Sequence, residues 1–136
     1  MKKINLIRVA KKSADIQISE LKKIKKIFNK SFLKAVETII SCKGKVITSG
    51  IGKSGLIARK VSATLSSVGI SSFYLNPGEA NHGDLGQIDK RDVLLVFSYS
   101  GNTSEINNML NNSDEVSNVI IEDVQDDEDS ILFGLN

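Results

Sequence analysis

The sequence has few of the residues that mark disulfides, metal sites and membrane spans. Its 136 residues include one cysteine and one histidine. A single cysteine cannot form an internal disulfide, and the usual nitrogen and sulfur ligands are too few for a metal cluster. No apolar run approaches the roughly 18 residues of a bilayer span, and Arg8 and Lys11 interrupt the short apolar stretch near the start. We therefore expect a cytoplasmic chain with no membrane anchor and no metal.

Aromatic residues are also scarce, at 5% of the chain, although one half of the sequence is strongly basic. Residues 1–68 carry 16 Lys and Arg against 3 Asp and Glu, a net charge of +13, whereas residues 69–136 carry 2 against 13, a net charge of −11. A basic half can indicate a nucleic-acid partner. Because aromatic residues are few and no nucleic-acid-binding motif is visible, we interpret the lysines as solvated helix faces and expect no nucleic-acid partner.

The remaining composition, 40% hydrophobic and 25% charged, is that of an ordinary globular domain. Apolar residues at three- and four-residue steps predict one long helix from about Ser13 to Ser41 and another from Ser54 to Val68. A further helix is expected to begin near Thr103, and the turn-rich segment 76–86 predicts a long ordered loop. Short β-branched or continuously apolar runs predict strands at 45–49, 70–75, 92–97 and, more weakly, 119–121.

Strands that alternate with helices predict right-handed crossovers and a parallel sheet, so we assign the fold class as α/β. The boundaries that follow are an N-terminal helical segment over 1–41, the α/β domain over 42–122 and a tail over 123–136. The tail is predicted from its run of acidic residues.

The first loop that indicates chemistry lies between a predicted strand and a predicted helix, and reads Gly50-Ile51-Gly52-Lys53-Ser54-Gly55. It matches the dinucleotide fingerprint G-x-G-x-x-G, but the next strand ends in Leu75-Asn76 without the acidic residue that would hold a ribose. An oxidoreductase with a nucleotide cofactor is therefore disfavoured, and we expect no cofactor. Glycines, a helix start and Lys53 together favour an anion site over a plain turn with an exposed lysine.

The second loop, Ser98-Tyr99-Ser100-Gly101-Asn102-Thr103-Ser104, also follows a predicted strand and precedes a predicted helix. Its hydroxyl groups, together with the helix N-terminal amides, can donate to phosphate oxygens. Helix capping alone would need one such residue rather than four. The sequence therefore predicts that both loops bind phosphate.

Two further residues admit a functional and a plain interpretation. Glu105, in the first turn after the second loop, is placed to exchange a proton with a bound substrate, or it only stabilises the helix dipole. His82 lies in the turn-rich loop, where a solvent-exposed histidine is as plausible as a functional one. Cys42 has no neighbouring base in sequence, so we interpret it as a core residue.

Taken together, these motifs closely resemble those of the arabinose-5-phosphate isomerases, which have the sugar-isomerase (SIS) fold. The resemblance runs in order from about residue 10 to residue 106 and is most specific in its Gly-Lys-Ser-Gly and His-Gly-Asp-Leu-Gly elements. The matching segments are Gly44-Lys45-Val46, Gly50-Ile51-Gly52-Lys53-Ser54-Gly55, Pro77-Gly78-Glu79-Ala80, His82-Gly83-Asp84-Leu85-Gly86 and Ser98-x-Ser100-Gly101-x-Thr103-Ser104-Glu105-Ile106.

The resemblance implies a three-layer αβα domain with a flavodoxin-like parallel sheet, in which the two loops meet where the topology switches. It also implies interconversion of D-ribulose 5-phosphate and D-arabinose 5-phosphate, a step towards lipopolysaccharide, in a homo-oligomer. Lys53 and Glu105 match the family's catalytic residues. The implied ligands of the sugar phosphate are Gly52, Ser54, His82, Ser98, Ser100 and Thr103.

The sequence departs from the family pattern at two places. Asn76 stands where family members commonly have a histidine that can bind metal, which again predicts no metal. The family's domain also continues beyond the matching region with further catalytic residues, whereas this chain has Asp126-Asp127-Glu128-Asp129 there, so the fold is expected to be truncated. Two functions follow as hypotheses: an isomerase, or a non-catalytic module that binds phosphosugars.

Overall fold

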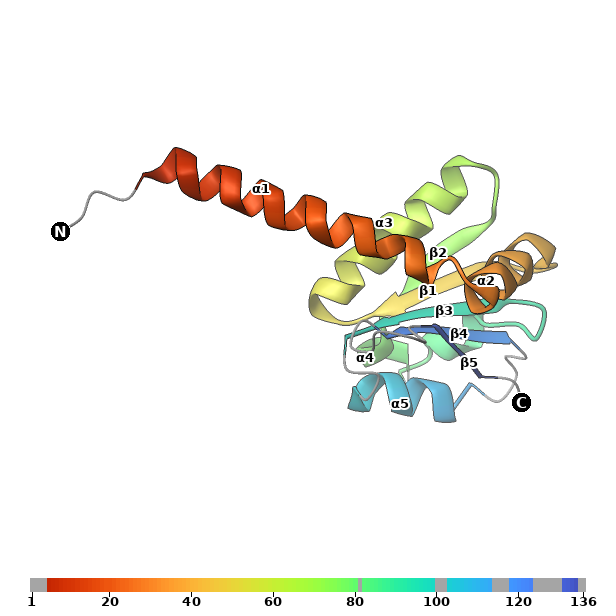
Figure 1. Cartoon of the computed structure of the whole chain (residues 1–136). Helices are drawn as coiled ribbons and strands as arrows, with labels where there is room; N and C mark the ends of the chain where they lie inside the picture. The colour runs from red at the N-terminus through yellow and green to blue at the C-terminus, as the bar shows by residue number, and fades with distance from the viewer. Residues whose placement is uncertain (1–4, 81, 100–102, 114–117, 124–130, 135–136) are drawn as a thin grey trace.

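The computed structural model describes residues 5–80, 82–99, 103–113, 118–123 and 131–134 (Figure 1). Within them, five strands form one sheet: β1 (Val46–Gly50), β2 (Ser72–Leu75), β3 (Val93–Ser98), β4 (Asn118–Asp123) and β5 (Ile131–Gly134). The α-helices are α1 (Leu6–Lys23), α2 (Lys30–Ser41), α3 (Gly52–Ser67), α4 (Pro77–Ala80) and α5 (Ser104–Asn111), and two 3₁₀ turns are η1 (Ile24–Ile27) and η2 (Asp84–Gln87).

The strand order is β2-β1-β3-β4-β5, and the first four strands are parallel to their neighbours. The predicted α/β class and parallel sheet are confirmed for these four. The last strand, β5, pairs with β4 in the antiparallel direction. It lies within the segment 123–136 that we predicted as an acidic tail. The dense carboxylates before it dominate the pattern there and concealed a strand of only four residues.

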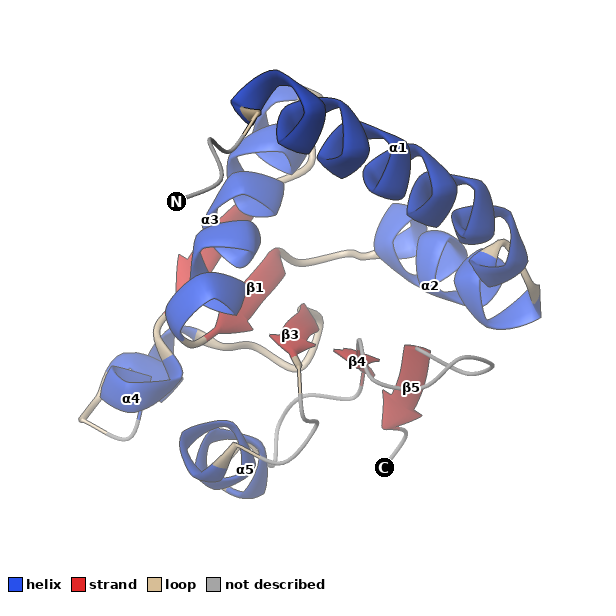
Figure 2. Cartoon of the chain, turned by 60° about the vertical axis from the view of Figure 1, so that its left-hand side comes forward, coloured by secondary structure: helices blue, strands red, loops and turns tan. Residues whose placement is uncertain are grey.

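Helices cover both faces of the sheet, which gives the predicted three layers. Figure 2 shows α1, α2 and α3 on one side and α4 and α5 on the other. The central strand β3 is buried on both faces because its side chains alternate: Leu94 and Val96 join the cluster that contains Met109 of α5, whereas Val93 and Leu95 join the cluster that contains Ala35 of α2. The continuous apolar run in the sequence has this cause.

The prediction of a single helix from Ser13 to Ser41 is wrong, because the helix is interrupted near Asn29. The Asn29 side chain accepts a hydrogen bond from the Phe32 amide at 3.0 Å and caps α2, after the 3₁₀ turn η1 has ended α1. Helix α1 then extends beyond the sheet (Figure 1), and none of its residues is buried. None of the helices described by the structure is both long and apolar enough to cross a bilayer.

The predicted long loop at 76–86 also contains regular structure. Pro77 starts the one-turn helix α4, and the amides of Glu79 and Ala80 donate to the Asn76 carbonyl at 3.1 and 3.0 Å. Proline suits a first helical position because its missing N–H would have no helical partner there. The loop is therefore anchored directly after β2, on the α5 side of the sheet.

Candidate functional site at the carboxyl ends of β1 and β3

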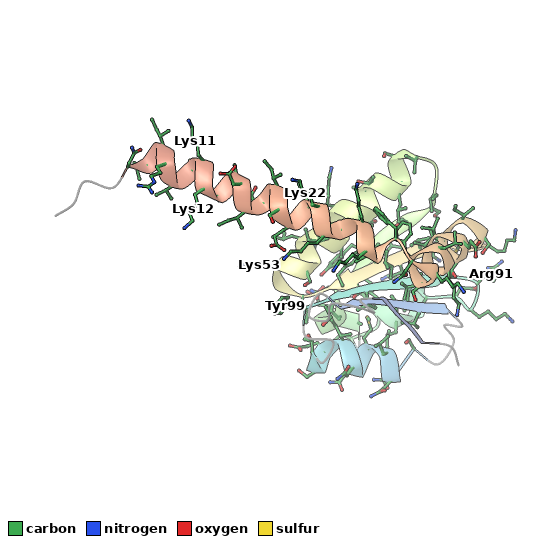
Figure 3. The ribbon with its side chains drawn as sticks, viewed as in Figure 1. Lys11, Lys12, Lys22, Lys53, Arg91 and Tyr99 are labelled. Atoms are coloured by element: carbon green, nitrogen blue, oxygen red, sulfur yellow. The ribbon has the colours of Figure 1, made fainter. Side chains whose placement is uncertain are left out.

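The two predicted loops leave the same edge of the sheet. Strands β1 and β3 are parallel neighbours, and Gly50 at the end of β1 lies opposite Phe97 near the end of β3. Figure 3 shows Lys53 and Tyr99 at this end of the sheet and Arg91 at the opposite end of the sheet. The expectation that the sheet brings the two loops together is confirmed, since their strands are adjacent and end together.

The first loop starts helix α3 without a side-chain cap. Ile51 occupies the N-cap position in an extended conformation, and its side chain offers no acceptor to the first turn. Gly52 follows with φ of +58°, a conformation that other residues rarely adopt. Lys53 is exposed and Ser54 is half-buried in the same turn. The first-turn amides, which lack helical partners, and the Lys53 ammonium therefore stand at one positive helix end.

The loop is packed tightly against its own strand. A Cβ atom on Gly55 would lie 2.7 Å from the Gly50 carbonyl oxygen, and one on Gly50 would lie 2.9 Å from the Phe97 carbonyl oxygen. These backbone contacts explain why both positions are glycine. The Tyr74 hydroxyl of β2 donates to the same Gly50 carbonyl at 2.8 Å. The sequence did not indicate Tyr74, because a tyrosine in a strand gives no signal of which carbonyl its hydroxyl reaches.

The second loop presents hydroxyl groups at the end of β3. Ser98, the last residue of that strand, is buried, and its hydroxyl oxygen lies 3.5 Å from that of Thr103. Thr103 occupies the N-cap position of α5, but its side chain makes no capping bond. The Thr103 hydroxyl is therefore not committed to the helix, as the phosphate interpretation requires. Ser100, predicted as a further ligand, lies outside the residues that the structure describes.

Glu105 lies in the first turn of α5, exposed to solvent. Its carboxylate accepts a hydrogen bond from the Ser104 hydroxyl at 2.8 Å. The Glu105 backbone N–H and then the Ser104 hydroxyl lower the pKa of this carboxyl below its usual value, against a small opposing effect of desolvation. The group is consequently ionised at neutral pH, the state in which a carboxylate can accept a proton.

His82 and Asn76 lie on the chain that follows β2, the other neighbour of β1. His82 is exposed, and its amide donates to the Glu79 carbonyl at 2.9 Å. The Asn76 side chain accepts from the Gly78 amide at 3.1 Å and so shapes the turn. The described contacts of His82 do not join it to either loop. In the part of the chain that the structure describes, no three His, Cys, Asp or Glu side chains are grouped as metal ligands.

A cavity of about 240 Å³ opens at the opposite edge of the sheet, where β3 begins. Cys42 borders it and packs against the core cluster on the α2 side, in agreement with the interpretation of this cysteine as a core residue. The cavity is thus separate from the two loops. Its lining residues are Thr38, Ser41, Cys42, Lys43, Arg91 and Val93.

Several known proteins with similar sequences are named as arabinose 5-phosphate isomerases. The chain is 44% identical over 101 residues to the arabinose 5-phosphate isomerase GutQ of Salmonella typhi, a match that covers 74% of this chain and 32% of that protein. It is 35% identical over 120 residues to the probable arabinose 5-phosphate isomerase of Haemophilus influenzae, covering 88% and 36%. The chain spans about a third of the length of these curated relatives.

Solved structures of similar proteins have the same fold as this chain. A protein of Escherichia coli CFT073 in complex with arabinose 5-phosphate is 38% identical with a TM-score of 0.75, over 90% of this chain and 66% of that chain. A putative phosphosugar isomerase involved in capsule formation from Bacteroides fragilis is 35% identical with a TM-score of 0.69, over 85% and 66%. The family model described as SIS domain matches residues 39–121, more than half of the chain. This chain therefore belongs to the SIS domain family.

Proposed function

We propose that the chain binds a pentose 5-phosphate and interconverts D-ribulose 5-phosphate and D-arabinose 5-phosphate in the cytoplasm. The observation that carries the proposal is that β1 and β3 are adjacent parallel strands, so the two turns that we expect to bind an anion leave the same edge of the sheet. One turn offers helix amides and Lys53, and the other offers the hydroxyls of Ser98 and Thr103. An ionised carboxylate, Glu105, follows the second turn directly. The names of the relatives agree with this chemistry.

The reaction moves one proton from C1 to C2 and one hydroxyl proton from O1 to O2 of the ketose, through an enediolate, and the reverse direction returns both. Glu105 takes the proton from one carbon and returns it to the other, because a carboxylate is already a base at neutral pH. Lys53 stabilises the negative charge that develops on the sugar oxygen. The phosphate is held by Gly52, Ser54, Ser98, Ser100 and Thr103, and His82 contacts the sugar.

A phosphosugar-binding module without catalysis is the second candidate. The groups that the two turns present, the first-turn amides of α3 and the hydroxyls of Ser98 and Thr103, can bind a phosphate without any proton transfer. Binding alone requires the two loops, whereas catalysis also requires the Glu105 carboxylate.

An assay of the purified chain separates the two candidates. Incubation with ribulose 5-phosphate, followed by a measurement of arabinose 5-phosphate, tests turnover, and thermal unfolding with and without arabinose 5-phosphate tests binding. Turnover supports the isomerase. Stabilisation without turnover supports the binding module. The absence of both turnover and stabilisation would overturn both candidate functions.

Replacement of Lys53 with alanine is expected to weaken sugar-phosphate binding by roughly three- to tenfold, since an exposed charge pair contributes modestly. The expected cause is loss of the ammonium at the start of α3, and titration calorimetry with arabinose 5-phosphate measures the effect. The matched control is Lys60→Ala, which removes an equally exposed charge from a later turn of the same helix. Equal losses in both variants would contradict a specific role for Lys53.

We also propose that the chain forms a homo-oligomer through α1 and the turn after it. Large apolar side chains along this segment are exposed, including Leu21 at 63% and Phe28 at 60%. Together with Ile7, Ala14 and Ile24 they recur at steps of seven, four and three residues, the spacing of one helix face. A second copy of the chain would remove this stripe from water.

Replacement of Leu21 with glutamine is expected to shift the chain from oligomer to monomer in sedimentation velocity at micromolar concentration. The monomer itself should keep its stability, because Leu21 contacts solvent rather than the core. Ser19→Gln, on the opposite face of α1, serves as the control and should leave the mass unchanged. A wild-type chain that sediments as a monomer would refute the oligomer.

A further inference from the structure

The end of β1 is held by one side chain from the neighbouring strand. Tyr74 lies on β2, one residue before the strand ends, and its hydroxyl donates to the Gly50 carbonyl at 2.8 Å. The same hydroxyl would lie 3.1 Å from a Cβ atom on Gly55 of α3. Tyr74 therefore contacts the strand end that precedes the glycine loop and approaches the helix that follows it.

The Tyr74 ring is held in place by a side chain of α3, that of Arg59. The guanidinium carbon of Arg59 lies 4.1 Å from the centre of the Tyr74 ring, a cation–π distance. Tyr74 is half-buried, and Arg59 is exposed on the helix that the glycine loop starts. The hydroxyl thus has a defined position relative to both β1 and α3, and a long aromatic side chain has few other rotamers to adopt there.

The hydrogen bond fixes the direction of one peptide group. The Gly50 carbonyl points to Tyr74 and to Gly55. No cis peptide occurs in the described residues, so the Ile51 N–H of the same planar group points the opposite way. Ile51 is the N-cap of α3, and its carbonyl in turn accepts from the Gly55 amide at 3.3 Å. The orientation set at Gly50 is consequently passed to the whole first turn that carries Lys53.

We infer that Tyr74 is a positioning residue for the phosphate-binding turn: its hydroxyl holds the Gly50–Ile51 peptide so that the amides of the glycine loop keep a fixed geometry for an anion. The role rests on the proposed binding of sugar phosphate. Tyr74 does not itself contact the ligand. Removal of the hydroxyl should cost affinity without a matching loss of fold stability.

The test compares Tyr74→Phe, which keeps the ring and its contact with Arg59, with Ser72→Ala. The Ser72 hydroxyl is a matched control because it also joins β2 to a β1 carbonyl, that of Val46 at 2.6 Å, but at the far end of the strands. Titration calorimetry of the full chain with arabinose 5-phosphate measures affinity, urea unfolding measures stability, and amide hydrogen exchange at Gly55 reports the geometry of the turn in the ligand-free protein.

We expect Tyr74→Phe to weaken binding by roughly five- to tenfold, the worth of one hydrogen bond, and Ser72→Ala to change it by less than about twofold. Unchanged affinity in Tyr74→Phe, or an equal loss in Ser72→Ala, would overturn the inference. If the wild-type chain binds no sugar phosphate, the proposed function fails and hydrogen exchange decides the positioning role alone. Faster exchange at Gly55 in Tyr74→Phe only would support it, and equal exchange in both variants would overturn it.

Discussion

Replacement of Glu105 with glutamine is expected to lower turnover of ribulose 5-phosphate by roughly 10²–10⁴-fold, the usual contribution of a positioned base. Binding should change little, because the amide keeps the shape of the side chain and its oxygen still accepts from the Ser104 hydroxyl. Parallel measurements of initial rates and of the dissociation constant for arabinose 5-phosphate separate the two effects. A fall in the rate with unchanged binding identifies Glu105 as the group that moves the proton.

The matched control for this substitution is Glu79→Gln, which also neutralises an exposed carboxylate in the first turn of a helix. Helix α4 follows β2, next to β1, so the two carboxylates belong to the same edge of the sheet. Turnover in Glu79→Gln should remain close to that of the wild-type chain. Full activity in Glu105→Gln, or equal losses in both variants, would contradict the assigned role.

The pH profile gives a second measurement of the same prediction. The pKa of Glu105 is lowered by its own backbone N–H and by the Ser104 hydroxyl. The carboxylate is the active base, so activity should be present above this pKa and lost as the pH falls through it. The acidic limb of the rate profile should therefore lie below pH 4.5, the ordinary value for a glutamic acid. Ser104→Ala should move that limb upwards.

The sheet could be predicted from the sequence because its strands and helices have different hydrophobic periods. Strand β3 is apolar from Val93 to Phe97 and packs on both faces, and the helices have the helical period, so the α/β class followed from the sequence pattern. The adjacency of the two loops was expected only from the family resemblance. The helix break at Asn29 was missed because an apolar stripe continues through it. The local cap that stops the helix competes with that stripe and is visible only as one asparagine.

The candidate site was predictable to the same extent. Residues with a charged side chain at a helix start, such as Lys53 and Glu105, could be chosen as candidates from their position in the sequence. Tyr74 was not, because its role depends on which carbonyl its hydroxyl reaches across two strands. The proposed contact of His82 with a sugar also depends on the path of the chain after β2, which no spacing rule fixes. The hydrophobic and motif patterns of the sequence thus do not predict long-range contacts made by single polar atoms.

Replacement of Asp92 with alanine is expected to lower the free energy of unfolding by roughly 3 kcal/mol, because it leaves the partners of this buried carboxylate without their hydrogen-bond acceptor. Asp92 is 1% exposed and precedes β3. Its two oxygens accept from the amides of Lys45 at 2.7 Å and Asp89 at 2.9 Å, and the Lys45 ammonium lies 3.3 Å away. A Cβ atom on Gly44 would collide with the same carboxylate, so the chain packs closely around it. Urea unfolding followed by circular dichroism measures the loss.

The control for this prediction is Asp89→Ala in the same turn. Asp89 pairs with Arg91 at 2.7 Å, but the Arg91 side chain is 66% and the Asp89 side chain 42% exposed, so water can replace that contact. The Arg91 guanidinium and amide hold the pKa of Asp89 at about 2, so its carboxylate stays ionised through the neutral range and the comparison is unaffected by protonation. The unfolding midpoint of Asp89→Ala should stay close to the wild-type value. Equal midpoints for Asp92→Ala and Asp89→Ala would show that burial of the carboxylate does not set the loss of stability. They would refute a stabilising role for the contacts by which Asp92, before β3, binds Lys45, before β1.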